Sequence, residues 1–148
     1  MPVTQSSHQP LKVALIVPAK KFRCLGSMLW IQRYGPLQVA SVTHEAGHFV
    51  RLFNEEIGNH LYPEKIASNF DVVGFSAKTS AITRAEELAE KIKTEARRLN
   101  RQIVTILGGE HASMVNGNRA SNMFDFMLPG ESEQAFLDIL KTIQKNLK

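Results

Sequence analysis

Three short stretches of the sequence bring glycine, hydroxyl and carboxylate residues directly after an apolar run, and each then opens into a helical pattern. Backbone without bulky side chains lets a ligand approach closely. Hydroxyls and free amide groups at a helix start can hold a ligand's amide or phosphate groups. The pattern indicates a cleft for a large, flat or phosphate-bearing molecule. The stretches are Gly74-Phe75-Ser76-Ala77-Lys78-Thr79, Gly108-Gly109-Glu110-His111-Ala112 and Pro129-Gly130-Glu131-Ser132-Glu133.

Each stretch also has a purely structural explanation. The hydroxyls from Ser76 to Ser80 could cap a helix, and the glycine pair could form a tight strand-to-helix turn. Glu131 and Glu133 stand where a helix macrodipole favours carboxylates. His111 could be a ligand, an acid or base, or a capping residue, and no nearby cysteine, aspartate or histidine completes a metal-ligand pattern.

Several motifs of other α/β proteins are missing from the sequence. No Gly-x-Gly-x-x-Gly follows the first apolar run, and no Gly-x-x-x-x-Gly-Lys or Gly-x-Ser-x-Gly occurs. The first run ends in Pro18-Ala19-Lys20, which is neither an acidic pair nor a hydroxyl-rich phosphate loop. These absences argue against a dinucleotide-binding domain, a nucleotide hydrolase, a phospho-receiver, a flavin-binding flavodoxin and an α/β-hydrolase.

Five strands alternating with five helices must position the three stretches. The run Val13–Val17 is continuously apolar, which is typical of a parallel strand covered on both faces. Strand–helix alternation predicts a parallel sheet between two helical layers, and five strands favour the flavodoxin-like (Rossmann-like) order 2-1-3-4-5. Ligands bind at the carboxyl edge of such sheets. We expect strands at 11–17, 49–53, 71–75, 102–107 and 124–128, and helices at 36–46, 63–69, 82–99, 112–120 and from 132 onward.

Local signals mark the ends of these helices. Gly47 is the expected left-handed stop of the first helix. Thr83 with Glu86 fits a capping box for the third helix, with Ser80 as the alternative cap. We expect Ser132 to cap the last helix. The predicted buried stripe of the third helix is Ile82, Ala85, Leu88, Ala89, Ile92, Ala96 and Leu99, and that of the last is Ala135, Phe136, Ile139, Leu140, Ile143 and Leu147.

The composition is that of one ordinary globular domain. Of 148 residues, 43% are hydrophobic and 22% charged, and the net charge is +4. We expect residues 1–10 to be a flexible tail and residues 11–148 a single domain. The lone Cys24 can form no internal disulfide, and no apolar run could cross a membrane, so we expect a cytoplasmic protein. The basic residues are spread out without a stripe of stacking aromatics, which argues against nucleic-acid binding.

Four segments in order resemble a known family. They are Gly35-Pro36-Leu37-Gln38-Val39-Ala40 with His44-Glu45-Ala46-Gly47-His48-Phe49-Val50, then Asp71-Val72-Val73-Gly74-Phe75-Ser76, Leu107-Gly108-Gly109-Glu110-His111-Ala112, and Pro129-Gly130-Glu131-Ser132-Glu133-Gln134-Ala135-Phe136. Their sequence and spacing are similar to the cobalamin-binding domain at the amino end of cobalamin-dependent radical S-adenosylmethionine enzymes. The resemblance covers nearly the whole chain, about 11–143.

The resemblance implies a flavodoxin-like domain that holds cobalamin at the carboxyl ends of its strands. It places the nucleotide tail of the cofactor in the crevice between the first and third strands. The implied contacts are Pro18 after the first strand, Ser76, Ala77, Lys78 and Thr79 after the third, Gly108, Gly109, Glu110 and His111 after the fourth, and Gly130 and Glu131 after the fifth. We expect a bulky residue in place of Gly109 to block this channel without disturbing the fold.

Two departures from related patterns refine this interpretation. The loop after the first strand lacks the cobalt-ligating histidine of the methionine synthase and mutase group, which implies base-off binding without a histidine on cobalt. The three-cysteine cluster motif of the radical enzymes is absent, which implies a module, stand-alone or a piece of a longer enzyme, that serves a partner radical S-adenosylmethionine or methyltransferase domain. The cobalt of the corrin is the only metal implied, and we expect no catalysis by the module itself.

Two other functions stay open on the residues alone. One is an interaction or regulatory domain with the same fold and no cofactor. The other is a small independent enzyme that uses His111 with Glu110 or Glu131 as acid and base, although no nucleophile or metal accompanies them.

Overall fold

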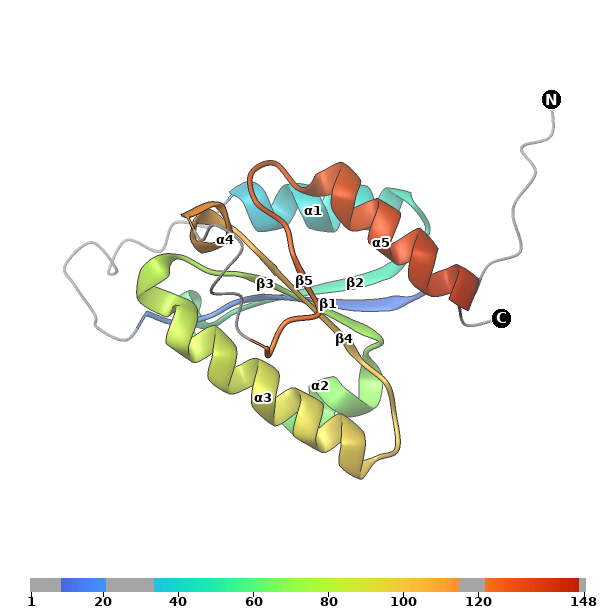
Figure 1. Cartoon of the computed structure of the whole chain (residues 1–148), viewed down its shortest axis with the longest axis horizontal. Helices are drawn as coiled ribbons and strands as arrows, with labels where there is room; N and C mark the ends of the chain where they lie inside the picture. The colour runs from blue at the N-terminus through green and yellow to red at the C-terminus, as the bar shows by residue number, and fades with distance from the viewer. Residues whose placement is uncertain (1–8, 21–33, 115–121, 147–148) are drawn as a thin grey trace.

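Five parallel strands form one sheet in the order β2-β1-β3-β4-β5. The computed structural model describes residues 9–20, 34–114 and 122–146. Helices α1 and α5 cover one face of the sheet, and α2 and α3 cover the other (Figure 1). The flavodoxin-like fold class and strand order predicted from the sequence are confirmed. The elements are β1 (Lys12–Val17), α1 (Tyr34–Glu45), β2 (Phe49–Asn54), η2 (Glu55–Ile57), α2 (Pro63–Asn69), β3 (Val72–Ser76), η3 (Thr79–Ala81), α3 (Ile82–Arg98), β4 (Val104–Gly108), α4 (Glu110–Met114), β5 (Phe126–Met127) and α5 (Glu133–Asn146).

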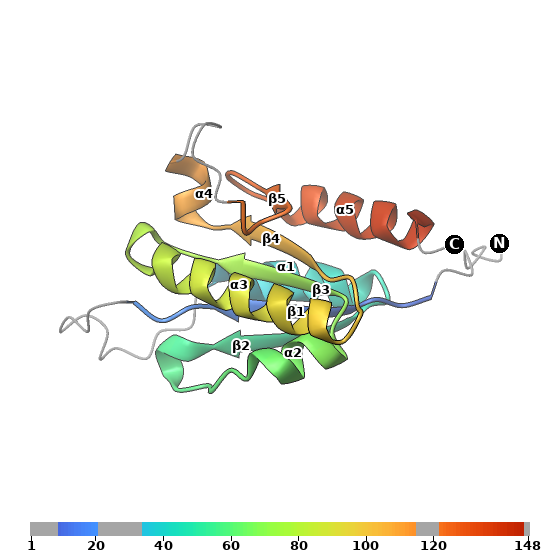
Figure 2. The same ribbon diagram turned by 60° about the horizontal axis from the view of Figure 1, so that its bottom comes forward.

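The interior strand β1 is buried on both faces after Lys12, which explains its continuous apolar sequence from Val13 to Val17. Ala14 and Ile16 pack into the cluster beneath α2 and α3, while Val13 and Leu15 pack into the cluster beneath α1 and α5. Figure 2 shows the same arrangement from a second side, with β2 and β5 at the two edges of the sheet. The domain therefore has two apolar cores, one on each side of the sheet.

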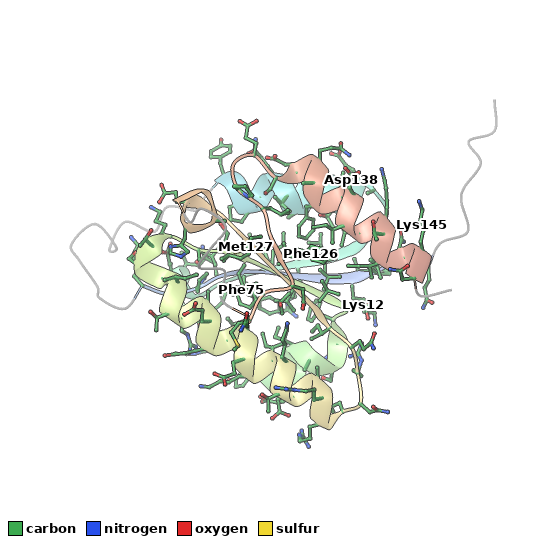
Figure 3. The ribbon with its side chains drawn as sticks, viewed as in Figure 1. Lys12, Phe75, Phe126, Met127, Asp138 and Lys145 are labelled. Carbon is green, nitrogen blue, oxygen red and sulfur yellow. The ribbon has the colours of Figure 1, made fainter. Side chains whose placement is uncertain are left out.

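An aromatic pair ties the fifth strand to the middle of the sheet. Phe75 of β3 lies on the α3 side (Figure 3) and meets Phe124 edge to face, with ring centroids 5.5 Å apart. Both side chains are buried. Edge-to-face aromatic pairs add to the stabilisation from burial itself. The segment that enters the short edge strand β5 is thus held by packing as well as by strand pairing.

Two expected helix starts are wrong in detail. The 3-10 turn η3 leads directly into α3, so Ala81 takes the N-cap position without a side-chain cap. Thr83 then lies inside the helix, and the predicted capping box with Glu86 does not form; Ser80, inside η3, is not the cap either. Helix α4 begins at Glu110, before the predicted start at 112, because the chain turns into a helix immediately after Gly109. Its predicted continuation to 120 lies partly outside the described residues.

Other predicted boundaries and stripes differ by a few residues. The fifth strand covers only Phe126–Met127. Ala135 of α5 is exposed, so it does not belong to the buried stripe predicted for that helix. Leu99 is 39% exposed beyond the end of α3, so it does not belong to the stripe predicted for α3. Gly47 is confirmed as the left-handed stop of α1, with φ 88°. None of the helices that the structure describes is long and apolar enough to span a membrane.

Two aspartate side chains accept hydrogen bonds at the amino edge of the sheet. Asp71 accepts hydrogen bonds from the backbone N–H of Lys12 at 2.9 Å and from Arg101 at 3.2 Å. Asp125 accepts one from the backbone N–H of Thr105 at 2.8 Å. These carboxylates therefore connect the first residues of neighbouring strands. They lie at the opposite edge of the sheet from the three glycine- and hydroxyl-containing stretches.

His48 is a buried structural histidine at this amino edge. It is 6% exposed, and its Nδ1 accepts a hydrogen bond from the backbone N–H of Leu11 at 3.2 Å. Burial lowers the pKa of His48 from its ordinary 6.5. Only the neutral imidazole can accept that bond, so protonation of His48 would break it in the folded state.

We expect the free energy of unfolding to decrease as the pH falls below about 6.5, because the unfolded chain then binds a proton at His48 that the folded chain does not. The contribution should be fully present above pH 6.5 and disappear toward the lowered pKa. Urea denaturation between pH 7.5 and 5 measures it. His48→Asn keeps an acceptor without titrating and should flatten this part of the profile. Identical profiles for the two proteins would contradict the assignment.

Candidate cofactor-binding site

A pocket opens at the carboxyl edge of the sheet, between the sheet and helices α1 and α5. Its volume is about 180 Å³. Apolar side chains and glycines make up most of its wall, and the polar side chains come mainly from the segment before α5. It is lined by Leu15, Ile16, Gly35, Pro36, Gln38, Val39, Gly74, Phe75, Ser76, Ile106, Gly108, Gly109, Leu128, Gly130, Glu131, Ser132, Glu133 and Phe136.

Strand register divides the pocket into an inner and an outer level. Leu15, Gly74 and Ile106 are neighbours across β1, β3 and β4 and form the inner row. Ser76 pairs with Gly108 two residues further toward the carboxyl ends, and this pair forms the outer row. Because side chains alternate along a strand, both rows face α1 and α5. The inner row is apolar, and the outer row brings the Ser76 hydroxyl to the mouth.

Gly74 makes space for the pocket's inner walls. A Cβ at this position would lie 2.8 Å from Leu15 Cδ2 and 3.2 Å from Phe136 Cε2. A larger residue in the strand would therefore push both side chains out of place. A glycine inside a buried strand often marks such a close approach.

The two adjacent glycines of the second stretch have different roles. A Cβ on Gly108 would have ordinary contacts, the nearest being Phe75 O and Ser132 Oγ at 3.8 Å. Gly109 has φ +91°, and a Cβ there would lie 2.9 Å from Ala77 O and 3.0 Å from Ala77 N. Gly109 is thus required by the turn, and the expectation that a bulky residue there would leave the fold intact is wrong. Gly108 is the position where added bulk can enter the pocket.

Five of the residues singled out from the sequence come together in the pocket wall: Ser76, Gly108, Gly109, Gly130 and Glu131. The other six do not line it: Pro18, Ala77, Lys78, Thr79, Glu110 and His111. The pocket therefore opens at the predicted edge of the sheet, and five of the eleven candidate residues line its wall.

The residues outside the wall have identifiable surroundings. Pro18 is buried at the end of β1. Ala77 is fully buried, and its backbone makes two hydrogen bonds. Its N–H donates to Gly108 O at 3.2 Å, and its carbonyl accepts from the N–H of His111 at 3.1 Å. The His111 ring lies 3.3 Å from Thr79 Oγ1.

Sequence reasoning missed the helical side of the pocket. Val39 and Pro36 of α1 and Phe136 of α5 line it, together with the apolar strand residues. These side chains read as ordinary core positions in the sequence. The available signal was Gly74, since an isolated glycine in an otherwise β-branched and aromatic strand points to a close approach.

A partly buried ion pair lies at the same edge of the sheet as the pocket. The Glu55 carboxylate, with a 10% exposed side chain, receives two hydrogen bonds from Arg84, at 2.7 and 3.1 Å. It also accepts the backbone N–H of Ala19 at 3.0 Å. The hydrogen bond that Arg84 donates to Glu55 raises the pKa of Arg84. The pair thus links the segments that follow β1 and β2 to the start of α3.

Within residues 9–20, 34–114 and 122–146, no group of three or more histidine, cysteine, aspartate and glutamate side chains is placed to hold a metal ion. His111 and Glu110 begin α4, whereas Glu131 lies on the pocket rim. The pocket itself combines an apolar interior with a polar mouth. It suits the insertion of a flat, largely apolar group attached to a polar body outside.

Comparison with known proteins gives a matching family and related solved structures. The model of the B12 binding domain matches residues 32–140. Two structures of the cobalamin-dependent S-adenosylmethionine radical enzyme OxsB share the fold, one with aqua-cobalamin bound and one with aqua-cobalamin and S-adenosylmethionine bound. Each gives a TM-score of 0.71 at 17% identity and covers 95% of this chain and 20% of that one. The chain therefore spans a fifth of the enzyme's length. No curated protein sequence matches it.

Proposed function

The chain belongs to the B12-binding domain family, whose cofactor is cobalamin, and we propose that it holds the corrin base-off at the carboxyl edge of its sheet. The family match and the shared fold confirm the resemblance seen in the sequence. When bound, the corrin supplies a cobalt centre for methyl or electron transfer. The protein's part is to bind and orient it.

The pocket between the sheet and helices α1 and α5 is the observation that carries this proposal. It opens at the carboxyl edge, where ligands of doubly wound sheets bind. Its volume of about 180 Å³ exceeds the roughly 150 Å³ of an apolar cavity that binds benzene. We propose that the base of the nucleotide tail enters this pocket. A base held there is not available as a ligand to cobalt.

Polar groups at the mouth fit the polar parts of the cofactor. The hydroxyls of Ser76 and Ser132 line the mouth, and Glu131 and Glu133 lie beside them at the start of α5. The hydroxyls can donate to phosphate oxygens, and the carboxylates can accept hydrogen bonds from the amide groups of the corrin. These four residues would hold the tail and the corrin rim, while the glycines let the cofactor approach the backbone.

The described histidines support a cobalt without a protein ligand. His44 and His48 lie at the end of α1 and just beyond it, at the amino edge, and His60 lies before α2. His111 is at the carboxyl edge, but it does not line the pocket, and its Nδ1 lies 3.3 Å from Thr79 Oγ1. We therefore infer that no histidine binds the cobalt. His8 lies outside the described residues.

We expect the Co(II) form of the bound cofactor to show no nitrogen superhyperfine splitting in its electron paramagnetic resonance spectrum. Neither the nucleotide base nor a histidine would then be a ligand to cobalt. His111→Ala should give the same spectrum. Splitting that disappears in His111→Ala, or that changes when the protein is labelled with ¹⁵N, would contradict base-off binding without histidine.

We further propose that the module serves a separate catalytic domain, either a radical S-adenosylmethionine domain or a methyltransferase. The OxsB chain is five times as long as the segment that this domain matches. The single cysteine of the sequence cannot hold an iron–sulfur cluster by itself. Residues 11–148 would form the binding unit, in the cytoplasm as the single cysteine favours.

The decisive experiment is retention of the cofactor. We expect the purified protein, mixed with hydroxocobalamin and desalted, to keep a stoichiometric amount of the cofactor, visible as a cobalamin absorption spectrum. Bovine serum albumin treated in the same way is the control for nonspecific carry-over. A colourless protein after desalting would favour the alternative of a cofactor-free interaction or regulatory domain. It would also remove the basis for assigning the pocket to a nucleotide tail.

A further inference from the structure

The inner level of the pocket is lined by apolar side chains. The inner row contributes Leu15 and Ile106, and Val39 and Phe136 close it from the two helices. Leu15 and Ile106 are 5% and 2% exposed, and Phe136 is 3% exposed. The neighbouring backbone of Gly74 is paired in the sheet on both sides. A group that reaches this level meets hydrocarbon from the strands and from both helices.

Of the polar side chains of the described wall, Gln38 on α1 is exposed to solvent, and the others lie nearer the mouth. Ser76 is two residues further along β3 than Gly74, and Ser132 precedes the first turn of α5, one turn before Phe136. Helices α1 and α5 both begin at the carboxyl edge, so Val39 and Phe136 lie deeper than the residues that precede them. Hydrogen-bonding capacity is therefore concentrated at the outer level, where the ribose and phosphate of a tail would lie.

We propose that this pocket selects cobamides by the chemistry of their lower base, preferring 5,6-dimethylbenzimidazole to adenine. This inference rests on the proposed function, because it requires a nucleotide tail in the pocket. The far edge of dimethylbenzimidazole carries two methyl groups, which match the apolar walls. The far edge of adenine carries an exocyclic amine and ring nitrogens, which would lose hydrogen bonds to water without gaining partners. Leaving such groups unsatisfied should weaken binding by about 10- to 100-fold.

The test compares the dissociation constants of three corrinoids with the same upper ligand, measured by titration calorimetry on the wild-type protein. They are cobalamin, the adenine-bearing cobamide and cobinamide, which lacks the nucleotide tail. We expect cobalamin to bind most tightly, the adenine form about 10- to 100-fold more weakly, and cobinamide more weakly than cobalamin. Equal affinity for the two complete cobamides would overturn the selectivity and leave the proposed function standing. Equal affinity for cobinamide and cobalamin, or no binding at all, would overturn the tail pocket itself.

A matched pair of variants separates polarity from shape. Val39 is only partly buried, so both variants should fold, which circular dichroism checks. Val39→Thr keeps the side-chain volume but adds a hydroxyl at the inner level, and it should reduce the preference for dimethylbenzimidazole at least about threefold. Val39→Ala removes hydrocarbon without adding a hydrogen-bonding group, so it should weaken the binding of both cobamides and change the preference less than Val39→Thr does. An unchanged preference in Val39→Thr, or an equal change in Val39→Ala, would overturn the proposal.

Discussion

Replacing Gly108 with leucine should abolish high-affinity cobalamin binding while the domain stays folded. A Cβ at Gly108 would have ordinary contacts of 3.8 Å or more, so the first side-chain atom of leucine fits without a clash. The remaining atoms of leucine must then extend along the pocket wall, past Ser132 and Leu128, where the tail would enter. We expect the dissociation constant for hydroxocobalamin to increase at least about 100-fold, which corresponds to about 2.7 kcal/mol. Absorption titration measures it.

Gly108→Ala is the control for this experiment. Its methyl group occupies only the space that the Cβ geometry already allows, so its affinity should stay within about fivefold of wild type. The free energy of unfolding of both variants should lie within about 1 kcal/mol of the wild-type value, because the backbone of Gly108 is not left-handed. Normal cobalamin binding by Gly108→Leu would show that the tail does not enter this pocket.

The fold was predictable because each layer leaves a simple pattern in the sequence. The run Val13–Val17 of β1 is apolar at every position because it is covered on both faces. The buried stripe of α3 repeats with helical period because one face of the helix packs on the sheet. The short β5 was less predictable. It pairs with β4 on one side only and depends on Phe124, outside the strand, for its packing. A strand held largely by tertiary contacts carries a weak local signal.

The site was predictable only where it depends on backbone. Ser76, Gly108 and Gly130 stand at strand ends, and the topology of a parallel sheet brings strand ends together. The inner wall depends on side chains such as Val39 and Phe136, whose types are the same in a filled core and in a pocket. Whether such residues touch one another or leave a gap is decided by the distance between layers. That distance is a tertiary property, and the sequence signals it only indirectly, through Gly74 in β3.

The glycine pair shows how one motif can combine a ligand role with a structural role. Gly108 and Gly109 are adjacent and look equivalent in the sequence, but only Gly109 adopts a left-handed conformation. A double glycine in this position therefore leaves both explanations open until the backbone is known. In this chain the turn requires Gly109, and we propose the ligand role for Gly108.

Gly109→Ala should be among the most destabilising single methyl additions in the domain. The variant must hold a side chain at φ +91°, and its Cβ would lie 2.9 and 3.0 Å from the backbone O and N of Ala77. Moving Ala77 away strains its hydrogen bonds to Gly108 O and from the N–H of His111. The left-handed conformation costs about 1 to 2 kcal/mol and each weakened hydrogen bond about 1 kcal/mol. We expect the free energy of unfolding in urea to fall by about 3 kcal/mol or more.

Gly47→Ala isolates the contribution of the contacts with Ala77. Gly47 has φ +88°, almost the same as Gly109, but a Cβ there would meet no atom within 4 Å. This variant should lose only the conformational part, about 1 kcal/mol. For a domain of this size, 1 kcal/mol shifts the melting temperature by roughly 2–4 °C, so the two variants should differ by several degrees. An equal decrease in the free energy of unfolding for the two variants would mean that the turn after β4 shifts to accommodate the added methyl group. The glycine pair would then matter for the cofactor alone, because the backbone of Ala77 would not be fixed against Gly109.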